Sequence, residues 1–140
     1  MILLDTSGLL AALDASQHHH RAAAEVLLEA GGPRLLSPFV LAELDYLLCT
    51  RVSLEAELAM LEEVARGAYR LEPFAADDVA AARDVVARFR SLGIGLADAS
   101  IVVLAERYDV SEVLTLDERH FRALRDSRGR SFRLLPADRA

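Results

Sequence analysis

The stretch that decides the fold is residues 1–8, which read MILLDTSG. A short apolar run bounded by polar residues is typical of a buried strand. This run ends in the carboxylate of Asp5, which is costly to bury unless another group compensates its charge. In open α/β sheets, ligands bind at the edge formed by the carboxyl ends of the strands. We therefore ask which other acids join Asp5 at that edge.

Composition limits the classes of protein that the chain can belong to. Its 140 residues, 53% of them hydrophobic, predict one folded domain spanning residues 1–140. The net charge of −6 argues against a protein that coats nucleic acid in general. The sequence has no lysine. This excludes a Walker lysine, a Schiff-base lysine, and the lysine required by phospho-aspartate receivers and by haloacid-dehalogenase-type phosphatases.

The sequence also predicts a cytoplasmic protein with no membrane contact. No apolar run approaches the roughly 20 residues that span a bilayer. The N-terminus lacks the basic region of a secretory signal. The one cysteine, Cys49, permits no internal disulfide, and its apolar helical surroundings predict an inert core thiol.

Short apolar segments alternate with helical patterns along the whole chain. Strands are expected at residues 1–4, 33–36, 69–72, 112–116 and 132–135. Helices are expected at 7–14, 17–30, 38–50, between Ser53 and Gly67, and at 75–90, 98–108 and 118–124. This alternation predicts a mainly parallel sheet covered on both faces, with all strand carboxyl ends along one edge.

The helix expected at 38–50 has few polar residues, so we expect it to be largely buried. Glu43 and Asp45 are the only charges in its apolar set. They lie two residues apart and point to different sides of the helix. We interpret Asp45 as the acid on the wetter side, which leaves Glu43 in need of a partner.

Parallel connectivity brings four acids to the same edge of the sheet. Asp5 and Asp117 each follow a strand directly. Asp98 lies in the first turn of the helix that leads into the fourth strand, so its helix must begin near that edge. Glu43 lies in the second turn of the helix that leaves the second strand there. The four carboxylates are therefore expected to converge on one pocket.

Converging carboxylates repel one another and raise each other's pKa values, and a divalent cation removes this repulsion. Oxygen ligands favour Mg²⁺ or Mn²⁺ over zinc. Such ions activate water and stabilise the oxygens of a phosphoryl displacement. The pattern thus predicts metal-dependent phosphodiester hydrolysis. A structural interpretation stays open for three of the acids, because Asp5, Asp98 and Asp117 each stand where a helix-capping acid is common.

With these acids assembled, the sequence resembles the PIN-domain ribonucleases, and among them the VapC-type toxins of toxin–antitoxin pairs. The similarity runs essentially end to end, and its four motifs occur in order. They are DTSGL at residues 5–9, SP at 37–38 followed by LAE at 41–43, GLADA at 95–99, and TLDERHF at 115–121.

This resemblance implies a three-layer α/β/α domain with a five-stranded parallel sheet. It also implies Mg²⁺- or Mn²⁺-dependent endonucleolytic cleavage of RNA that leaves a 5′-phosphate. It assigns metal binding to four acids and support of those acids or of bound water to two hydroxyls: Asp5, Glu43, Asp98 and Asp117, with Thr6 and Thr115.

The same resemblance implies partners. VapC-type proteins form homodimers and bind a small antitoxin that blocks the pocket, and they meet DNA only indirectly, through the antitoxin. Two alternatives remain at this point. One is a PIN-domain nuclease of RNA maturation or decay without an antitoxin, and the other is a non-catalytic RNA-binding module.

Several features lie outside these motifs. Adjacent histidines at a helix start point in different directions, so His18-His19-His20 is predicted to be a solvated or dimer-side cluster. For His120 we expect a position on the helix surface, with substrate contact as the alternative. Six arginines between residues 119 and 133 either guide RNA or balance excess acid: Arg119, Arg122, Arg125, Arg128, Arg130 and Arg133. The apolar surfaces around Leu9, Leu13 and residues 54–61 are either partner contacts or core.

Overall fold

Short parallel strands joined by helices form the centre of the molecule. The structure, a computed structural model, describes residues 1–139. Its strands are β1 (Ile2–Leu4), β2 (Arg34–Leu36), β3 (Arg70–Leu71), β4 (Glu112–Leu114) and β5 (Arg133–Leu135). Its helices are α1 (Thr6–Leu13), α2 (His20–Glu29), α3 (Pro38–Arg51), α4 (Leu54–Ala65), α5 (Ala76–Arg88), α6 (Leu96–Tyr108) and α7 (Glu118–Phe121), with a 3₁₀ turn η1 at Arg90–Leu92.

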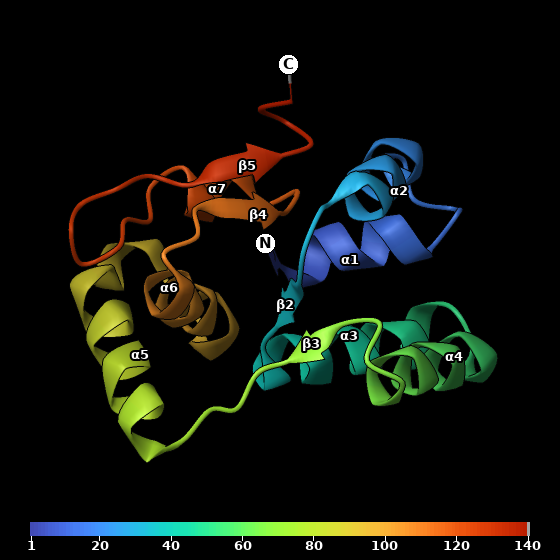
Figure 1. Ribbon diagram of the computed structural model, residues 1–140, viewed down its shortest axis with the longest axis horizontal. Coiled ribbons are helices and arrows are strands. Elements are labelled where there is room, and N and C mark those ends of the chain that lie inside the picture. The colour runs from blue at the N-terminus through green and yellow to red at the C-terminus, as the bar shows by residue number, and fades with distance from the viewer. Residues whose placement is uncertain (140) are drawn as a thin grey trace.

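The strands form one sheet in the order β3-β2-β1-β4-β5, and every neighbouring pair is parallel. Helices α5 and α6 lie on one side of the sheet, and α1 and α2 lie on the other (Figure 1). This arrangement confirms the predicted three-layer α/β/α fold with five parallel strands. Because β1 is the central strand, the residue that follows it lies in the middle of the carboxyl edge.

The central strands and α6 supply much of the core. The three residues of β1 are at most 2% exposed. Helix α6 packs against α5, α3 and β1, and eight of its thirteen residues are buried. Being covered on several sides explains why the sequence of α6 is apolar almost all round.

Helix α3 is less buried than its sequence predicts, so that expectation is wrong. Only Val40, Leu44 and Leu48 are buried, one stripe at the i, i+4, i+8 spacing. Tyr46 is 67% exposed, and Cys49 is also exposed, which contradicts its assignment as a core thiol. Helix α3 packs against α1, α4 and α6, and these three neighbours leave Tyr46 and Cys49 exposed.

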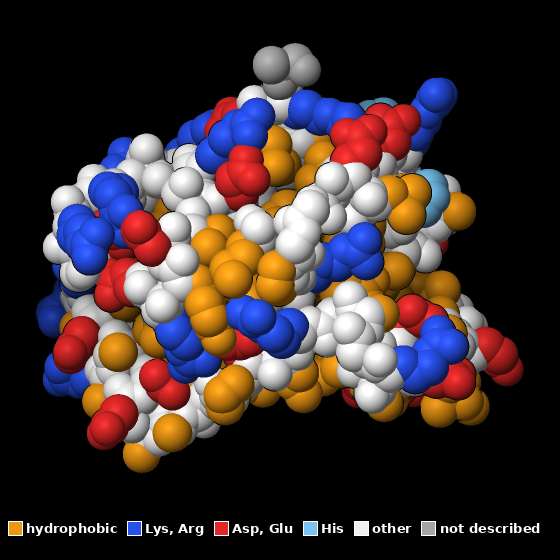
Figure 2. All heavy atoms as spheres, in the orientation of Figure 1, with side chains coloured by type: hydrophobic (Ala, Val, Ile, Leu, Met, Phe, Trp, Pro, Cys, Tyr) orange, Lys and Arg blue, Asp and Glu red, His pale blue; other side chains and the backbone are white. Residues whose placement is uncertain are grey.

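The structure also decides which apolar surfaces are core. Leu9 is fully buried, whereas Leu13 is 39% exposed. On α4, Leu54, Leu58 and Leu61 are exposed, and hydrophobic side chains line the edge of the molecule where α3 and α4 lie (Figure 2). Among the described residues, no helix is long and apolar enough to cross a membrane.

Gly8 allows α1 to pack directly on the end of β4, which leads to a prediction. A Cβ at residue 8 would overlap with the carbonyl group of Leu114, and backbone cannot move aside as a side chain can. We expect Gly8→Ala to lower the free energy of unfolding by about 2 kcal/mol through overpacking. Urea unfolding measures this change.

Gly31→Ala is the matched control. No atom lies within 4 Å of the Cβ position there, so its unfolding midpoint is expected to stay near that of the parent protein. Equal midpoints for the two variants would contradict the tight contact between α1 and β4.

Candidate active site

Asp5 is buried at the end of β1 and is held by two hydroxyl groups. Its side-chain atom Oδ2 accepts hydrogen bonds from Ser7 Oγ and Thr115 Oγ1, each at 2.7 Å. Burial raises the pKa of Asp5 although these bonds favour the charged form. Asp5 precedes α1, but its side chain makes no capping hydrogen bond, so the capping interpretation does not apply to it.

The hydroxyls tie together segments that are remote in sequence. Ser7 Oγ accepts the backbone N–H of Leu116, and Thr115 Oγ1 accepts that of Asp117, both at 2.9 Å. The bond between Ser7 and Leu116 joins the turn after β1 to the turn after β4, and the bond between Thr115 and Asp117 lies within the second of these turns. The predicted supporting residue Thr115 therefore contacts Asp5 directly, and the other, Thr6, donates to Glu43 Oε1 at 2.7 Å.

Ser7 is a site residue that the sequence reasoning did not single out. Its position two residues after Asp5 was the available signal, since a serine there can reach back to the carboxylate across one turn. Ser7 Oγ also lies 3.2 Å from Thr115 Oγ1. The two hydroxyls thus act as one unit on Asp5.

The environments of the two acids of α3 are the reverse of those expected. Glu43 is exposed, and its contact in the site is the hydroxyl of Thr6. Asp45 is half-buried, and its Oδ1 is buried with no hydrogen-bond partner among the described residues. Asp45 lies close to Glu57 of α4, and the proximity of its carboxyl group raises the pKa of Glu57. The assignment of Asp45 to the wetter side is therefore wrong.

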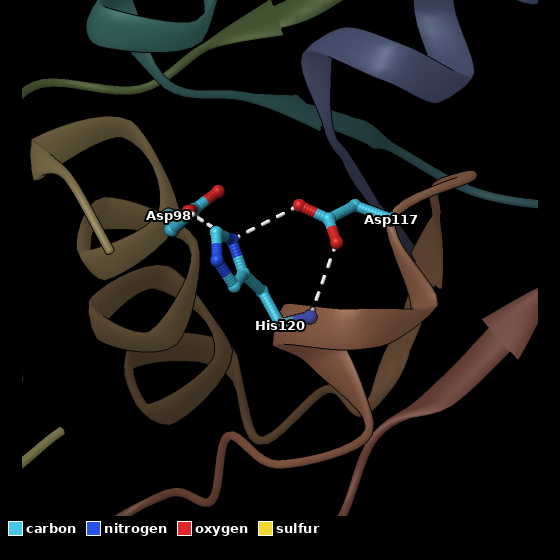
Figure 3. Close-up of side chains that lie close together, drawn as sticks. All are labelled: Asp98, Asp117 and His120. Atoms are coloured by element: carbon cyan, nitrogen blue, oxygen red, sulfur yellow. Dashed lines mark hydrogen bonds and ion pairs between the residues drawn. The ribbon is translucent and has the colours of Figure 1, made fainter. Parts of the chain in front are cut away.

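Asp98, Asp117 and His120 meet where two helices begin (Figure 3). Asp98 lies in the first turn of α6. Asp117 is the N-cap of α7, and its Oδ1 accepts the backbone N–H of His120 at 3.1 Å. Asp117 is therefore a helix-capping residue, as the structural interpretation allowed, but only one of its carboxylate oxygens takes part in the cap. The other, Oδ2, lies 3.0 Å from His120 Nδ1.

The other three predicted acids lie near enough for their charges to act on Asp98, and among residues 1–139 the side chains close enough to share one ion are Asp98, Asp117 and His120. Burial raises the pKa of Asp98 to about 6, and the negative charges of Asp5, Asp117 and Glu43 add to the rise. The His120 ring acts in the opposite direction. Neighbouring charges change the pKa of Asp98 in this way only if they lie close to it in a partly buried environment.

His120 does not lie on an outer helix surface as expected. Its side chain is 20% exposed, and its ring lies between Asp98 and Asp117 (Figure 3). Nδ1 is 3.2 Å from Asp98 Oδ2. The sequence signal was its spacing of three residues from Asp117, which places both side chains on the same face of a helical turn.

Most of the other basic residues form ion pairs and hydrogen bonds outside the acid cluster. Arg122 pairs with Glu118 and Asp138, and Arg130 pairs with Asp109 and Asp126. Arg133 pairs with Glu112, and Arg125 donates to backbone carbonyls. In the histidine run, His18 and His19 are exposed, and His20 Nδ1 lies 2.8 Å from Ala11 O.

The residues present fit a divalent cation. Asp98, Asp117 and His120 each offer one ligand atom, and these atoms lie within 4.8 Å of one another. Carboxylates that raise each other's pKa values gain stability when a cation neutralises them.

The raised pKa of Asp98 leads to a stability prediction. A carboxyl group with a higher pKa in the folded state contributes stability below its unfolded value of 3.8 and loses it as the pH rises through about 6. At pH 7 without metal, Asp98→Asn is therefore expected to stabilise the protein. The gain should be roughly 1 kcal/mol, or about 3 to 5 °C in Tm.

Thermal melting with and without Mn²⁺ measures this effect. We expect Mn²⁺ to raise the Tm of the parent protein and to have much less effect on the variant. Asp77→Asn, at an exposed acid in the first turn of α5, is the control. A metal-free Asp98→Asn protein that melts below the parent would contradict the electrostatic argument.

Comparison with known proteins bears on this site. Residues 2–126 match the family model of the PIN domain. The chain is 44% identical over 135 residues to ribonuclease VapC26 of Mycobacterium tuberculosis, covering 96% of this chain and all of that protein.

Similar solved structures include two toxin structures. One is VapC20 of M. tuberculosis, described as a sarcin–ricin loop cleaving toxin, with a TM-score of 0.78, 22% identity, and coverage of 84% of this chain and 90% of that one. The other is VapBC2 of Rickettsia felis bound to a promoter DNA fragment, with a TM-score of 0.63, 20% identity, and coverage of 96% and 97%. At these identities the structures support the fold, whereas the family model and the 44% identical relative show the family. The chain belongs to the PIN-domain family and, within it, to the VapC-type ribonucleases.

Proposed function

We propose that this protein is the toxin of a toxin–antitoxin pair and cleaves RNA endonucleolytically with the help of Mg²⁺ or Mn²⁺. The observation that carries the proposal is the convergence of acids from separate segments of the chain, where burial and neighbouring negative charges raise the pKa of Asp5 and of Asp98. Buried carboxylates that lie close together are stabilised by a bound cation, and perturbed pKa values of this kind cluster at functional sites.

In this proposal Asp5, Glu43, Asp98 and Asp117 hold the metal, and the hydroxyls of Thr6 and Thr115 fix two of these acids. Thr115 and Ser7 hold Asp5 through Oδ2 alone, which leaves Oδ1 outside both hydroxyl bonds. Thr6 restrains Glu43, whose exposed side chain loses conformational entropy when it becomes ordered. Ligands fixed before the ion arrives bind it at a lower entropic cost.

When bound, the ion supplies an activated water and neutralises charge on the phosphodiester. It also lets an acidic protein accept a polyanion, since the net charge of the chain is −6. Arg122, Arg130 and Arg133 form ion pairs within the protein and are therefore not free to bind the RNA backbone. Arg119 lies two residues after Asp117 and is exposed. We infer that Arg119 lies along the path of the RNA backbone.

The proposed protein partners are a small antitoxin and a second copy of the chain. The exposed apolar residues Tyr46, Leu54, Leu58 and Leu61 support this, because they lie on two helices that pack against each other and exposed apolar surface of this kind is typical of interaction sites. Contact with DNA would then occur only through the antitoxin. A reducing cytoplasm is the compartment that this role requires.

RNA cleavage by Asp5→Asn tests the nuclease assignment. The substitution keeps the shape of the side chain and removes the charge, so we expect a loss of more than about a hundredfold. That exceeds what is typical when a group only orients a ligand. The measurement is the rate of cleavage of a labelled RNA with Mg²⁺ or Mn²⁺, with Asp77→Asn as the control. Equal rates for Asp5→Asn and the parent would mean that the activity does not come from this site.

The antitoxin is tested separately. We expect a short open reading frame beside the gene to encode a small protein that binds this chain and suppresses its RNA cleavage when the two are mixed at equal concentrations. If cleavage is metal-dependent but no such inhibitor exists, the alternative of a PIN-domain nuclease for RNA processing holds. If neither the parent protein nor Asp5→Asn cleaves RNA, the non-catalytic RNA-binding module holds.

A further inference from the structure

One ring nitrogen lies at the centre of the acid cluster, at ion-pair distance from two carboxylates. His120 Nδ1 is buried and has no hydrogen-bond partner among residues 1–139. It nevertheless lies 3.0 Å from Asp117 Oδ2 and 3.2 Å from Asp98 Oδ2. A nitrogen that faces two carboxylate oxygens without a well-aligned hydrogen bond to either is placed to share a cation with them.

We propose that His120 is a metal ligand of this site and that its nitrogen makes the site prefer Mn²⁺ to Mg²⁺. This inference rests on the proposed metal-dependent function. It goes beyond it by adding a nitrogen donor to a ligand set otherwise made of carboxylates, and by naming the ion that such a set selects.

Two of the distances in this group are those expected between neighbouring ligand atoms of one ion. With ligands at about 2.1 Å, adjacent ligand atoms of an octahedron are about 3.0 Å apart. The two distances from Nδ1 to the carboxylate oxygens, 3.0 and 3.2 Å, match this edge. In Figure 3 the ring lies between the two carboxylates, and dashed lines join its nitrogen Nδ1 to both of them.

The local backbone fixes this arrangement. Asp117 is the N-cap of α7, and its Oδ1 holds the backbone N–H of His120. The same turn therefore presents Asp117 Oδ2 and His120 Nδ1 side by side. Phe121, the next residue, is fully buried and anchors the turn in the core. His120 is thus positioned as rigidly as the acids are.

The nitrogen donor decides the metal preference. Mg²⁺ is a hard ion that favours oxygen, whereas imidazole raises affinity for first-row transition metals relative to Mg²⁺. A neutral nitrogen also adds a ligand without adding a negative charge to acids that already repel one another. The chain therefore gains affinity for Mn²⁺ at no electrostatic cost.

Two substitutions separate the role of the nitrogen from that of the side chain. His120→Asn places an amide oxygen near the position of Nδ1 and makes the site all-oxygen. His120→Ala removes the donor altogether. His18→Asn, at an exposed histidine, is the matched control. Circular dichroism and thermal melting establish that each variant is folded.

The first readout is spectroscopic. Electron spin echo envelope modulation of the Mn²⁺-loaded protein is expected to show a directly bound nitrogen in the parent and in His18→Asn. The signal should be lost in both His120 variants. Mn²⁺ bound to the parent without nitrogen coupling would overturn the inference, because the ion would then have displaced the ring.

The second readout is affinity. Titration calorimetry is expected to show Mn²⁺ binding weakened at least about tenfold in His120→Ala. In His120→Asn the ratio of the Mg²⁺ and Mn²⁺ dissociation constants should fall toward one. An unchanged ratio would overturn the inference while leaving the proposed nuclease intact. A parent protein that binds neither ion would overturn both, and the Asp5→Asn assay reports on the nuclease independently.

Discussion

The burial of carboxylates at the carboxyl edge of the sheet, where they also repel one another, is the constraint on which the site depends. Asp5 follows the central strand and is only 5% exposed, so its charge cannot be stabilised by water. The hydroxyls of Ser7 and Thr115 offset part of that cost, and they also join the turns after β1 and β4. The same bonds therefore support both the charge and the fold.

The placement of the acids was predictable because it follows from topology. Asp5 and Asp117 come directly after parallel strands, and Asp98 begins a helix that returns to the sheet, so connectivity alone brings them to one edge. The roles of Ser7 and His120 were not predictable in the same way. Each depends on the rotation of a single turn, which a hydrophobic pattern does not determine.

The exposure of α3 shows a different limit of sequence reasoning. Its apolar residues suggested burial, yet only one stripe is buried, and Tyr46 and Cys49 face outward. An apolar side chain indicates that a position is buried, but the sequence does not show whether it is buried within its own chain or against a partner. In a protein that binds a partner, core residues and interface residues therefore have similar sequence patterns. Asp45 was misplaced for the same reason, since the burial of each face of α3 was misjudged.

The site combines acids that differ in freedom as well as in charge. Asp5 is buried and bonded twice, Asp117 is held by its own helix cap, and Glu43 is exposed and restrained through one hydroxyl. An ion bound by these acids would have to order the side chain of Glu43, whereas the carboxylates of Asp5 and Asp117 are already held by hydrogen bonds. Binding is therefore favoured by preorganisation at the rigid ligands and costs entropy mainly at the exposed one. A neutral ring nitrogen on the rigid side strengthens the preorganised part of the site without increasing the repulsion that an added acid would bring.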